Sequence, residues 1–169
     1  MKQEFSLAHL TVLGCAPPEM TYIAARAGYD YVSIRPIYMG LPGEPNYALA
    51  EKKDLLRQTK AALNSTGVRL HDIELARIFD GVDVKSYLPA MQVAAELGGR
   101  AVLSSIWGGE RDYYIEKFAE LCDLARPLGW NEDRRRQGHL PVGRCRRALL
   151  AHDVRRRRQA LLHHWLPRR

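Results

Sequence analysis

The feature that most constrains this chain is a unit that recurs along residues 1–129: an amphipathic helix, a glycine and then an apolar, strand-like segment. Glycine suits the left-handed turn that ends a helix, and strands that alternate with helices favour a parallel sheet with right-handed crossovers. The pattern therefore predicts an α/β fold of about four βα units, which fits either a (β/α)8 barrel or a doubly wound sheet. The expected strands are residues 5–13, 29–36, 68–78 and 100–107. Three of the expected helices are residues 17–26, about 48–64 and about 110–126. The remaining helix is capped by Asp83 and includes Leu88, Met91 and Ala95.

The repeat breaks at Gly129, where a fifth strand is due. The segment WNEDRRRQGH follows, and it has neither apolar alternation nor a β-branched residue. Residues 1–129 carry 14 Lys and Arg against 16 Asp and Glu, a net charge of −2, whereas residues 130–169 carry 12 Arg against 3 Asp and Glu, a net charge of +9. The sequence thus predicts two parts, a domain at 1–129 and an Arg-rich tail at 130–169 that is disordered or weakly helical.

Composition narrows the class of protein further. No stretch approaches the roughly 20 apolar residues that a membrane span needs, and the N-terminal segment lacks the pattern of a secretory signal. Cys15, Cys122 and Cys145 stand apart without a metal-ligand spacing, which favours reduced thiols. A cytoplasmic protein without membrane contact is the expectation.

The third strand-like segment, VRLHDIELARI, carries the most informative polar residues. Alternation along a strand would place Asp72 and Glu74 on one face and His71 and Arg77 on the other. Carboxylates within an apolar strand are costly unless they are paired or solvated. Glu74 is therefore a candidate catalytic base or hydroxyl acceptor in a sugar pocket; the alternative is a buried ion pair with Arg35.

Three further residues are candidates for binding a substrate. Arg35 ends the second strand, where a guanidinium can bind a phosphate or carboxylate, or pair with Asp72 or Glu74. His9 lies in the first strand and either lines the pocket or is a core residue. Trp107 ends the fourth strand and offers either a flat ring to a sugar or a packing surface.

The segments PPEMTYIAARAGYDYVSIR, GVRLHDIELARI and AAELGGRAVLSSIW resemble the sugar phosphate isomerase/epimerase family, the xylose isomerase-like TIM barrels. The resemblance covers residues 1–129 and implies the N-terminal half of a (β/α)8 barrel. It also implies a sugar or sugar phosphate substrate and a divalent metal (Mn, Mg, Co or Zn) that assists proton transfer beside a carbonyl. Since the family's metal ligands come largely from later strands, no metal ligand is assigned here. Glu74 inherits the catalytic role, and His9, Arg35 and Trp107 the substrate wall.

Three functional interpretations follow. The first is a truncated isomerase or epimerase that is inactive by itself, because four strands cannot close a barrel. The second is a protein that binds nucleic acid non-specifically through its basic C-terminal arm. The third is a homo-oligomer in which two half-barrels complete eight strands.

The simultaneous change of composition and loss of the strand at residue 129 suggest that the Arg-rich tail results from a shifted reading frame. Reading the gene in its other two frames tests this hypothesis. We expect a single-base change near codons 126–130 to restore an apolar strand, followed by a second half-barrel with its own carboxylates and histidines. A frame that shows no such strand would remove the hypothesis.

Overall fold

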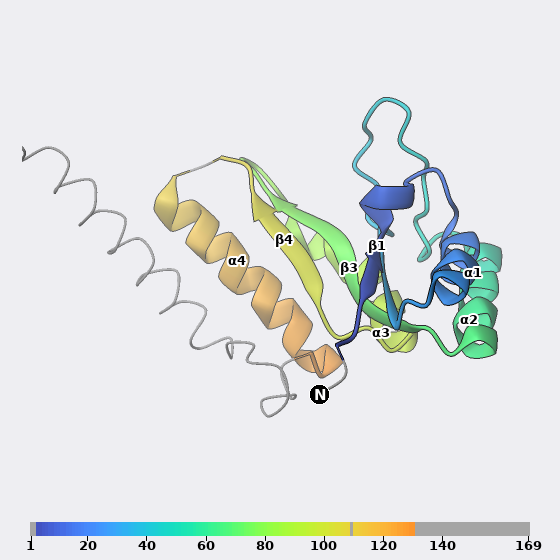
Figure 1. The fold of residues 1–169 in the computed structure, drawn as a ribbon. Coiled ribbons are helices and arrows are strands. Elements are labelled where there is room, and N and C mark those ends of the chain that lie inside the picture. The colour runs from blue at the N-terminus through green and yellow to red at the C-terminus, as the bar shows by residue number, and fades with distance from the viewer. Residues whose placement is uncertain (1–2, 109, 131–169) are drawn as a thin grey trace, which may run out of the picture.

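The computed structural model describes residues 3–108 and 110–130, which form one parallel sheet flanked by helices (Figure 1). The four strands lie in the order β1-β2-β3-β4, so each strand pairs with the next one along the chain. This is the arrangement expected of part of a (β/α)8 barrel. The strands are β1 (Ser6–Ala8), β2 (Tyr31–Ile34), β3 (Arg69–Ile78) and β4 (Val102–Ile106), and the helices are α1 (Pro17–Ala27), α2 (Lys53–Thr66), α3 (Leu88–Glu96) and α4 (Arg111–Ala125), with short 3₁₀ turns η1 (His9–Val12), η2 (Val84–Tyr87) and η3 (Arg126–Leu128).

The predicted βα alternation is confirmed, and the glycines end the helices as expected. Gly28 and Gly67 follow α1 and α2 in the left-handed conformation, with φ of 80° and 72°. Asp83 caps the segment before α3, where its Oδ1 accepts a hydrogen bond of 3.0 Å from the backbone N–H of Lys85. That cap begins the 3₁₀ turn η2 rather than the α-helix itself, which starts at Leu88.

Two elements depart from their predicted bounds by about five residues at one end, and the second and fourth strands are each shorter by about two residues at one or both ends. The strand expected at 5–13 ends at Ala8, because His9 turns away into η1 and binds the backbone of two other segments through its ring. The helix expected from about residue 48 begins at Lys53. Residues 48–52 nevertheless contribute Leu49, which is fully buried in the core.

The core lies between the sheet and its helices. Figure 1 shows α1 and α2 together at the β1 end of the sheet and α4 at the β4 end, with α3 behind the strands. Burying apolar side chains in this layer is the main stabilising contribution to such a fold. Completely buried members include Met20 of α1, Val32 of β2, Ile73 and Ile78 of β3, and Met91 of α3.

Gly99 joins α3 to β4 at a point where the backbone passes very close to β3. A Cβ atom at this position would lie 2.9 Å from Leu70 Cδ2 and 3.1 Å from the carbonyl oxygen of Ala94. Only glycine fits such an approach without displacing its neighbours. The glycine expected between helix and strand therefore has a second role here, because it allows the close packing of the two segments.

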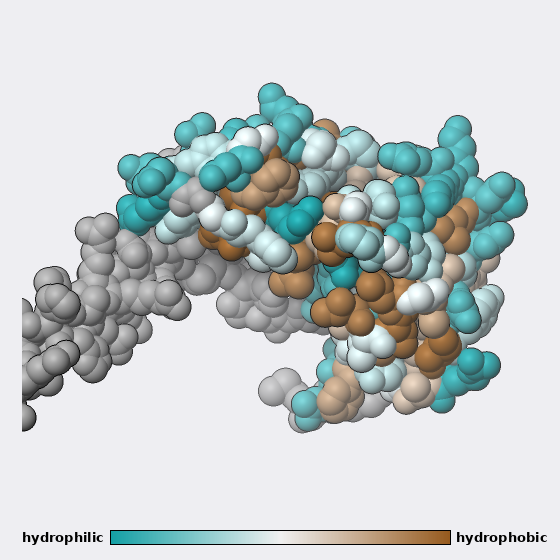
Figure 2. Space-filling view, turned by 90° about the horizontal axis from the view of Figure 1, so that it is seen from above, coloured by the Kyte–Doolittle hydropathy of each residue, from teal (hydrophilic) through white to brown (hydrophobic). Residues whose placement is uncertain are grey.

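The face of the sheet that is turned away from the helices carries no covering layer among the described residues. Figure 2, which looks onto the carboxyl ends of the strands, shows a hollow bordered by apolar surface. On the edge strand β4, Leu103 is 52% exposed. β1 and β4 are the two edges of the sheet, so their outer backbone groups lack strand partners in the described part of the chain.

No helix within the described ranges is long and apolar enough to cross a membrane. The tail predicted at 130–169 falls almost entirely on residues outside the described ones. Its first residue, Trp130, is described, and it packs against the apolar core.

The exposed edge strand predicts self-association. We expect Leu103→Lys to lower association, because a lysine on an edge strand opposes pairing with another chain. The free energy of unfolding should change by less than about 0.5 kcal/mol, since the side chain is exposed. Sedimentation velocity and urea unfolding measure the two quantities.

Leu10→Lys is the matched control, because Leu10 is 66% exposed but lies in η1, next to β1 and at the opposite edge of the sheet from β4. Equal effects of the two substitutions would show that general hydrophobicity, and not the β4 edge, causes association.

Candidate functional site

The polar residues of β3 converge on one face because its pairing with both neighbours is irregular. Leu70, Ile73, Ala76 and Ile78 belong to the core, and the register shifts between Val32 and Ser33 on β2 and between Ile73 and Ala76 on β3. Intervals of three in place of two turn the intervening residues away from the helices. Asp72, Glu74 and Arg77 thus share the face opposite the core. We call this the inner face, and we include in it Ser33 of β2 and Arg35, which directly follows β2.

The strict alternation expected from the sequence is therefore only half right. Asp72 and Glu74 do share a face, but Arg77 is not on the opposite one; it lies on the inner face with them. His71 also lies on this side, since its ring contacts Tyr31 at a centroid distance of 5.4 Å. A bulge moves every later residue to the other face, and the side-chain pattern alone does not record it.

Glu74 is the buried carboxyl of the inner face, with 8% of its surface exposed. Burial raises the pKa of Glu74, and the neighbouring Asp72 carboxylate raises it further, whereas the Arg35 guanidinium lowers it. Asp72 is the neighbouring carboxyl, and its Oδ1 is buried without a hydrogen-bond partner among the described residues. A buried carboxyl with a raised pKa, such as that of Glu74, is a candidate for proton transfer.

Arg35 follows Ile34, which pairs with Ile73, so the register sets Arg35 beside Glu74. Its guanidinium is held from the other side by Glu44, with Nη2 3.8 Å from Oε1, and Nη2 also lies 3.4 Å from the Met39 sulfur. Its Nε is buried and has no hydrogen-bond partner among the described residues. Arg35 therefore has an unused donor on a cation that is 8% exposed.

Glu44 is a residue of this cluster that the sequence reasoning missed. Its Oε2 accepts hydrogen bonds from the backbone N–H groups of Met39 and Leu41, at 3.0 and 3.2 Å, so it also shapes the loop after β2. One signal pointed to it: Glu44 is the only acidic residue in the Gly- and Pro-rich segment 36–50. The ion pair foreseen between Arg35 and a β3 carboxylate is not among the ion pairs of the described residues. The guanidinium pairs with Glu44 instead and acts on Glu74 through its charge alone.

His9 is fully buried, and both of its ring nitrogens are engaged by backbone groups. Nδ1 accepts a hydrogen bond of 2.9 Å from the Arg35 N–H, which leaves Nε2 to donate to the Cys15 carbonyl oxygen at 2.8 Å. The ring also stacks on Tyr47 at a centroid distance of 5.3 Å. Burial lowers the pKa of His9, the Cys15 carbonyl opposes that shift, and the Arg35 charge adds to it. His9 is thus a neutral side chain whose hydrogen bond fixes the backbone of Arg35.

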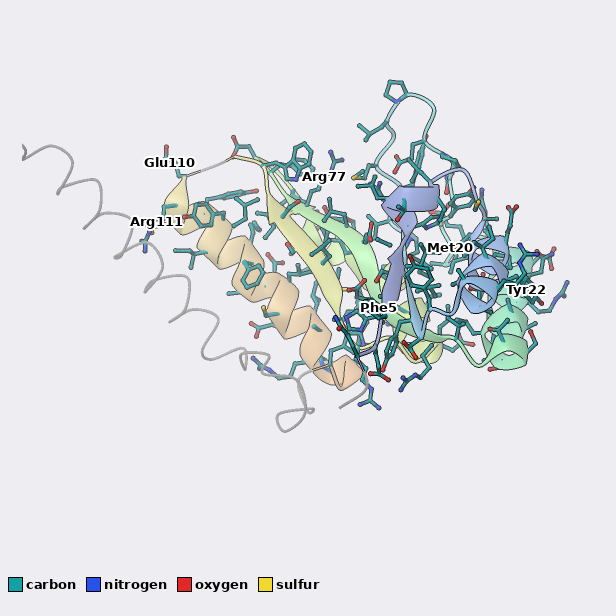
Figure 3. The ribbon with its side chains drawn as sticks, in the orientation of Figure 1. Phe5, Met20, Tyr22, Arg77, Glu110 and Arg111 are labelled. Atoms are coloured by element: carbon teal, nitrogen blue, oxygen red, sulfur yellow. The ribbon has the colours of Figure 1, made fainter. Side chains whose placement is uncertain are left out.

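Trp107 stands at the carboxyl end of β4, where 62% of its surface is exposed. Its indole N–H donates to the Ser105 hydroxyl, and the guanidinium carbon of Arg77 lies 5.6 Å from its ring centroid. Figure 3 shows Arg77 near the ends of β3 and β4, the end of the sheet from which Glu110 and Arg111 begin α4. Trp107 therefore forms a group with Arg77, separate from the cluster of Glu74, Arg35 and His9.

The described residues do not supply a metal site. Residues 3–108 and 110–130 contain no group of three or more His, Cys, Asp or Glu side chains arranged to hold a metal ion. Asp72 and Glu74 provide two carboxylates at most, and the ring nitrogens of His9 are both occupied. The ligand set that the family resemblance implies does not fit this part of the chain.

Solved structures share this fold. One is a xylose isomerase domain-containing protein of Salmonella typhimurium LT2, with 17% identity and a TM-score of 0.60 over 76% of this chain and 47% of that one. The fold is half of a xylose isomerase-like barrel. A protein of Sinorhizobium meliloti 1021 matches with 17% identity and a TM-score of 0.55, over 75% of this chain and 48% of its own. The IolI protein, whose structure contains a zinc atom, matches with 17% identity and a TM-score of 0.58, over 75% and 49%.

This half-barrel spans about half the length of the solved structures that it matches. No protein-family model and no curated protein matches its sequence. The structural likeness establishes the fold, and the chemistry is argued from the inner face.

The lowered pKa of His9 predicts a stability loss in mild acid. The unfolded chain takes up a proton on His9 as the pH falls below about 6.5, while the folded chain resists it, so the free energy of unfolding falls in that range. We expect the difference in unfolding free energy between the wild type and His9→Asn to shrink from pH 8 to pH 5.5. Urea unfolding at several pH values measures it.

The raised pKa of Glu74 has the opposite effect on stability, because the folded chain binds a proton at this carboxyl before the unfolded chain does. Both proteins contain Glu74, so its contribution cancels in the difference of unfolding free energies. Parallel curves for the two proteins would contradict the assignment, as would an NMR titration in which the His9 ring takes up its proton above pH 6.5.

Proposed function

We propose that residues 1–129 are the front half of a metal-assisted sugar isomerase or epimerase, in which the intact barrel moves a proton next to a sugar carbonyl. The observation that carries the proposal is the buried Glu74 carboxyl, whose pKa is raised, beside Arg35 on the inner face. Active sites of such barrels lie on the carboxyl side of the strands. The fold shared with xylose isomerase-like proteins supports the choice of a sugar as substrate.

In this proposal Glu74 is the catalytic residue of the half-barrel. In an isomerisation its carboxylate would accept a proton from the sugar carbon beside the carbonyl and return it to the former carbonyl carbon, while a proton passes from the neighbouring hydroxyl to the carbonyl oxygen. In an epimerisation Glu74 would take the proton from one face, and a second group from the other half of the barrel would donate a proton to the opposite face. A raised pKa suits both steps, because a proton carrier works best when its pKa lies near the working pH. Arg35 would bind a hydroxyl or carbonyl oxygen of the sugar through its guanidinium, and Trp107 would border the sugar ring.

His9 serves this site through Arg35. It touches the Arg35 backbone and not the open face, so its role is to position the guanidinium. The divalent metal of the intact enzyme would polarise the sugar oxygen, and its ligands would come from the missing half of the barrel, since the described residues lack them. The half-barrel alone is therefore proposed to be inactive.

The alternative of a nucleic-acid-binding protein rests on the basic tail, of which residues 131–169 lie outside the described ones. Residues 1–129 carry a net charge of −2, which opposes phosphate binding over the domain as a whole. No described feature favours this function over the first.

The proposal predicts no measurable isomerase or epimerase turnover by the purified chain. The assay supplies aldoses, ketoses and their phosphates with Mn²⁺ or Mg²⁺ and follows the exchange of a carbon-bound proton with deuterated water by NMR. Clear metal-dependent turnover by this chain would refute the proposed inactivity.

A second experiment supplies the other half of the barrel. A chimaera that joins residues 1–129 to the second half of a related barrel should exchange the proton, and Glu74→Gln should lower that rate by about 100-fold or more. Asp72→Asn is the matched control, because it removes a neighbouring inner-face carboxylate that has no proposed role in proton transfer. An unchanged rate in Glu74→Gln would exclude Glu74 as the catalytic residue.

A further inference from the structure

The sheet has two open edges of the same kind. All three strand pairings are parallel, and β1 and β4 each pair with a single neighbour in the part of the chain that the structure describes. The outer backbone N–H and C=O groups of both strands are therefore available to a further strand. Because every strand of the sheet points the same way, a parallel strand would extend either edge in the pattern that the sheet already has.

Exposed apolar side chains flank both edge strands. Leu103 and Ile106 of β4 are 52% and 42% exposed, and Phe5, which directly precedes β1, is 54% exposed. Figure 2 shows apolar surface along the border of the hollow at the carboxyl ends of the strands. Apolar side chains that stay exposed beside unpaired strand edges are typical of surfaces that contact another chain.

Residues 131–169 are too few to supply four further βα units. The four units of the structure take up residues 6–128, whereas residues 131–169 number 39. This chain covers 47%, 48% and 49% of the three solved structures that share its fold, so each of them has about as much polypeptide again. A second copy of this chain has the length that a closed (β/α)8 barrel still needs, and it supplies four strands of the same kind.

A twofold axis along the strands would satisfy both edges at once. A half-turn about such an axis keeps the direction of every strand, so that β4 of one copy lies parallel to β1 of the other and the same junction forms twice. Closure of a sheet into a barrel leaves no edge, and twofold dimers are the commonest symmetric assemblies. A contact of β4 with β4 would instead leave both copies of β1 open.

We propose that two copies of this chain close into one eight-stranded barrel, in which β4 of each copy pairs in parallel with β1 of the other. The inference goes beyond the proposed function and does not rest on it. In the dimer the inner faces of both copies line a single interior, so Glu74 and Arg35 of each copy border one mouth. Residues 3–108 and 110–130 of each copy lack a group of metal ligands, so closure by itself does not supply the proposed metal chemistry.

The first experiment measures the mass of the full-length chain in solution, by sedimentation velocity and by native mass spectrometry over a range of concentrations. We expect a discrete species of twice the chain mass of 19.3 kDa, whose mass stops rising because a closed barrel has no edge left. Species that keep growing with concentration would indicate open stacking of edges. A monomer at every concentration would indicate that the chain covers its own edges. Either result would overturn the inference.

The second experiment tests which edges meet. Ala8 is exposed on β1 and Leu103 is exposed on β4, at opposite edges of one copy. We expect Leu103→Lys and Ala8→Glu each to raise the dimer Kd by about tenfold or more, which is the scale of a well-buried interface residue. Both substitutions in one chain should recover most of the lost affinity, because the lysine of one copy then lies near the glutamate of the other.

Two controls make the recovery specific. Leu103→Lys combined with Ala8→Lys places like charges at the same junction and should not recover the affinity. Leu41→Lys introduces the same charge at an exposed leucine in the loop after β2, away from both edges, and should leave the Kd unchanged. An equal loss in Leu41→Lys, or equal affinities of the opposite-charge and like-charge pairs, would contradict the pairing of β4 with β1.

Hydrogen exchange of the wild-type chain tests the same junction without any substitution. Backbone amides of β1 and β4 should exchange more slowly above the dimer Kd than below it, whereas those of β2, which is paired on both sides, should change least. Equal changes in all strands would overturn the inference even if a variant does not fold. These measurements do not depend on turnover, so their failure leaves the proposed proton transfer standing, and an inactive chimaera leaves the dimer standing.

Discussion

The two register shifts in the pairing of β3 are the constraint on which the site depends. They rotate the strand between Leu70 and Ala76, so that apolar side chains reach the helices at intervals of three while the polar ones turn to the inner face. A regularly alternating strand would have sent Arg77 into the apolar layer, where an unpaired charge is very costly. The irregular pairing therefore gives β3 both a continuous core face and a row of ionisable groups on the other side.

The charges on the inner face are compensated by several nearby groups and not by one strong ion pair. Arg35 lies between Glu44 in the loop and Glu74 on the neighbouring strand, and His9 fixes its backbone as a neutral ring. Arg35 lowers the pKa of Glu74, but burial and the Asp72 carboxylate each raise it by more. Glu74 consequently remains a buried carboxyl with a raised pKa even next to an arginine.

Much of this fold could be predicted from the sequence, because helix periodicity, capping glycines and apolar strands are local properties that can be recognised in short segments of the chain. The sequential order of the strands followed from the family resemblance, since the pattern by itself also fits a doubly wound sheet. The shared face of Asp72 and Glu74 followed from the alternation along the third strand. The early end of β1 could not be foreseen, since it depends on a histidine ring that binds backbone atoms of Cys15 and Arg35. The face of Arg77 was mispredicted for a similar reason, because bulges arise from pairing between strands. Glu44 contacts its partner only once the loop is folded.

The sequential strand order has a consequence for how the chain acquires its structure. Every strand pairs with the one that follows it, but a crossover separates the two partners, as between Ser6 and Tyr31 or between Tyr31 and Arg69. Parallel pairing of this kind pays the entropy of closing each crossover before its contacts form, and it is therefore an intrinsically slow step of folding. No strand waits for a partner beyond the next βα unit, so the sheet can be completed one crossover at a time.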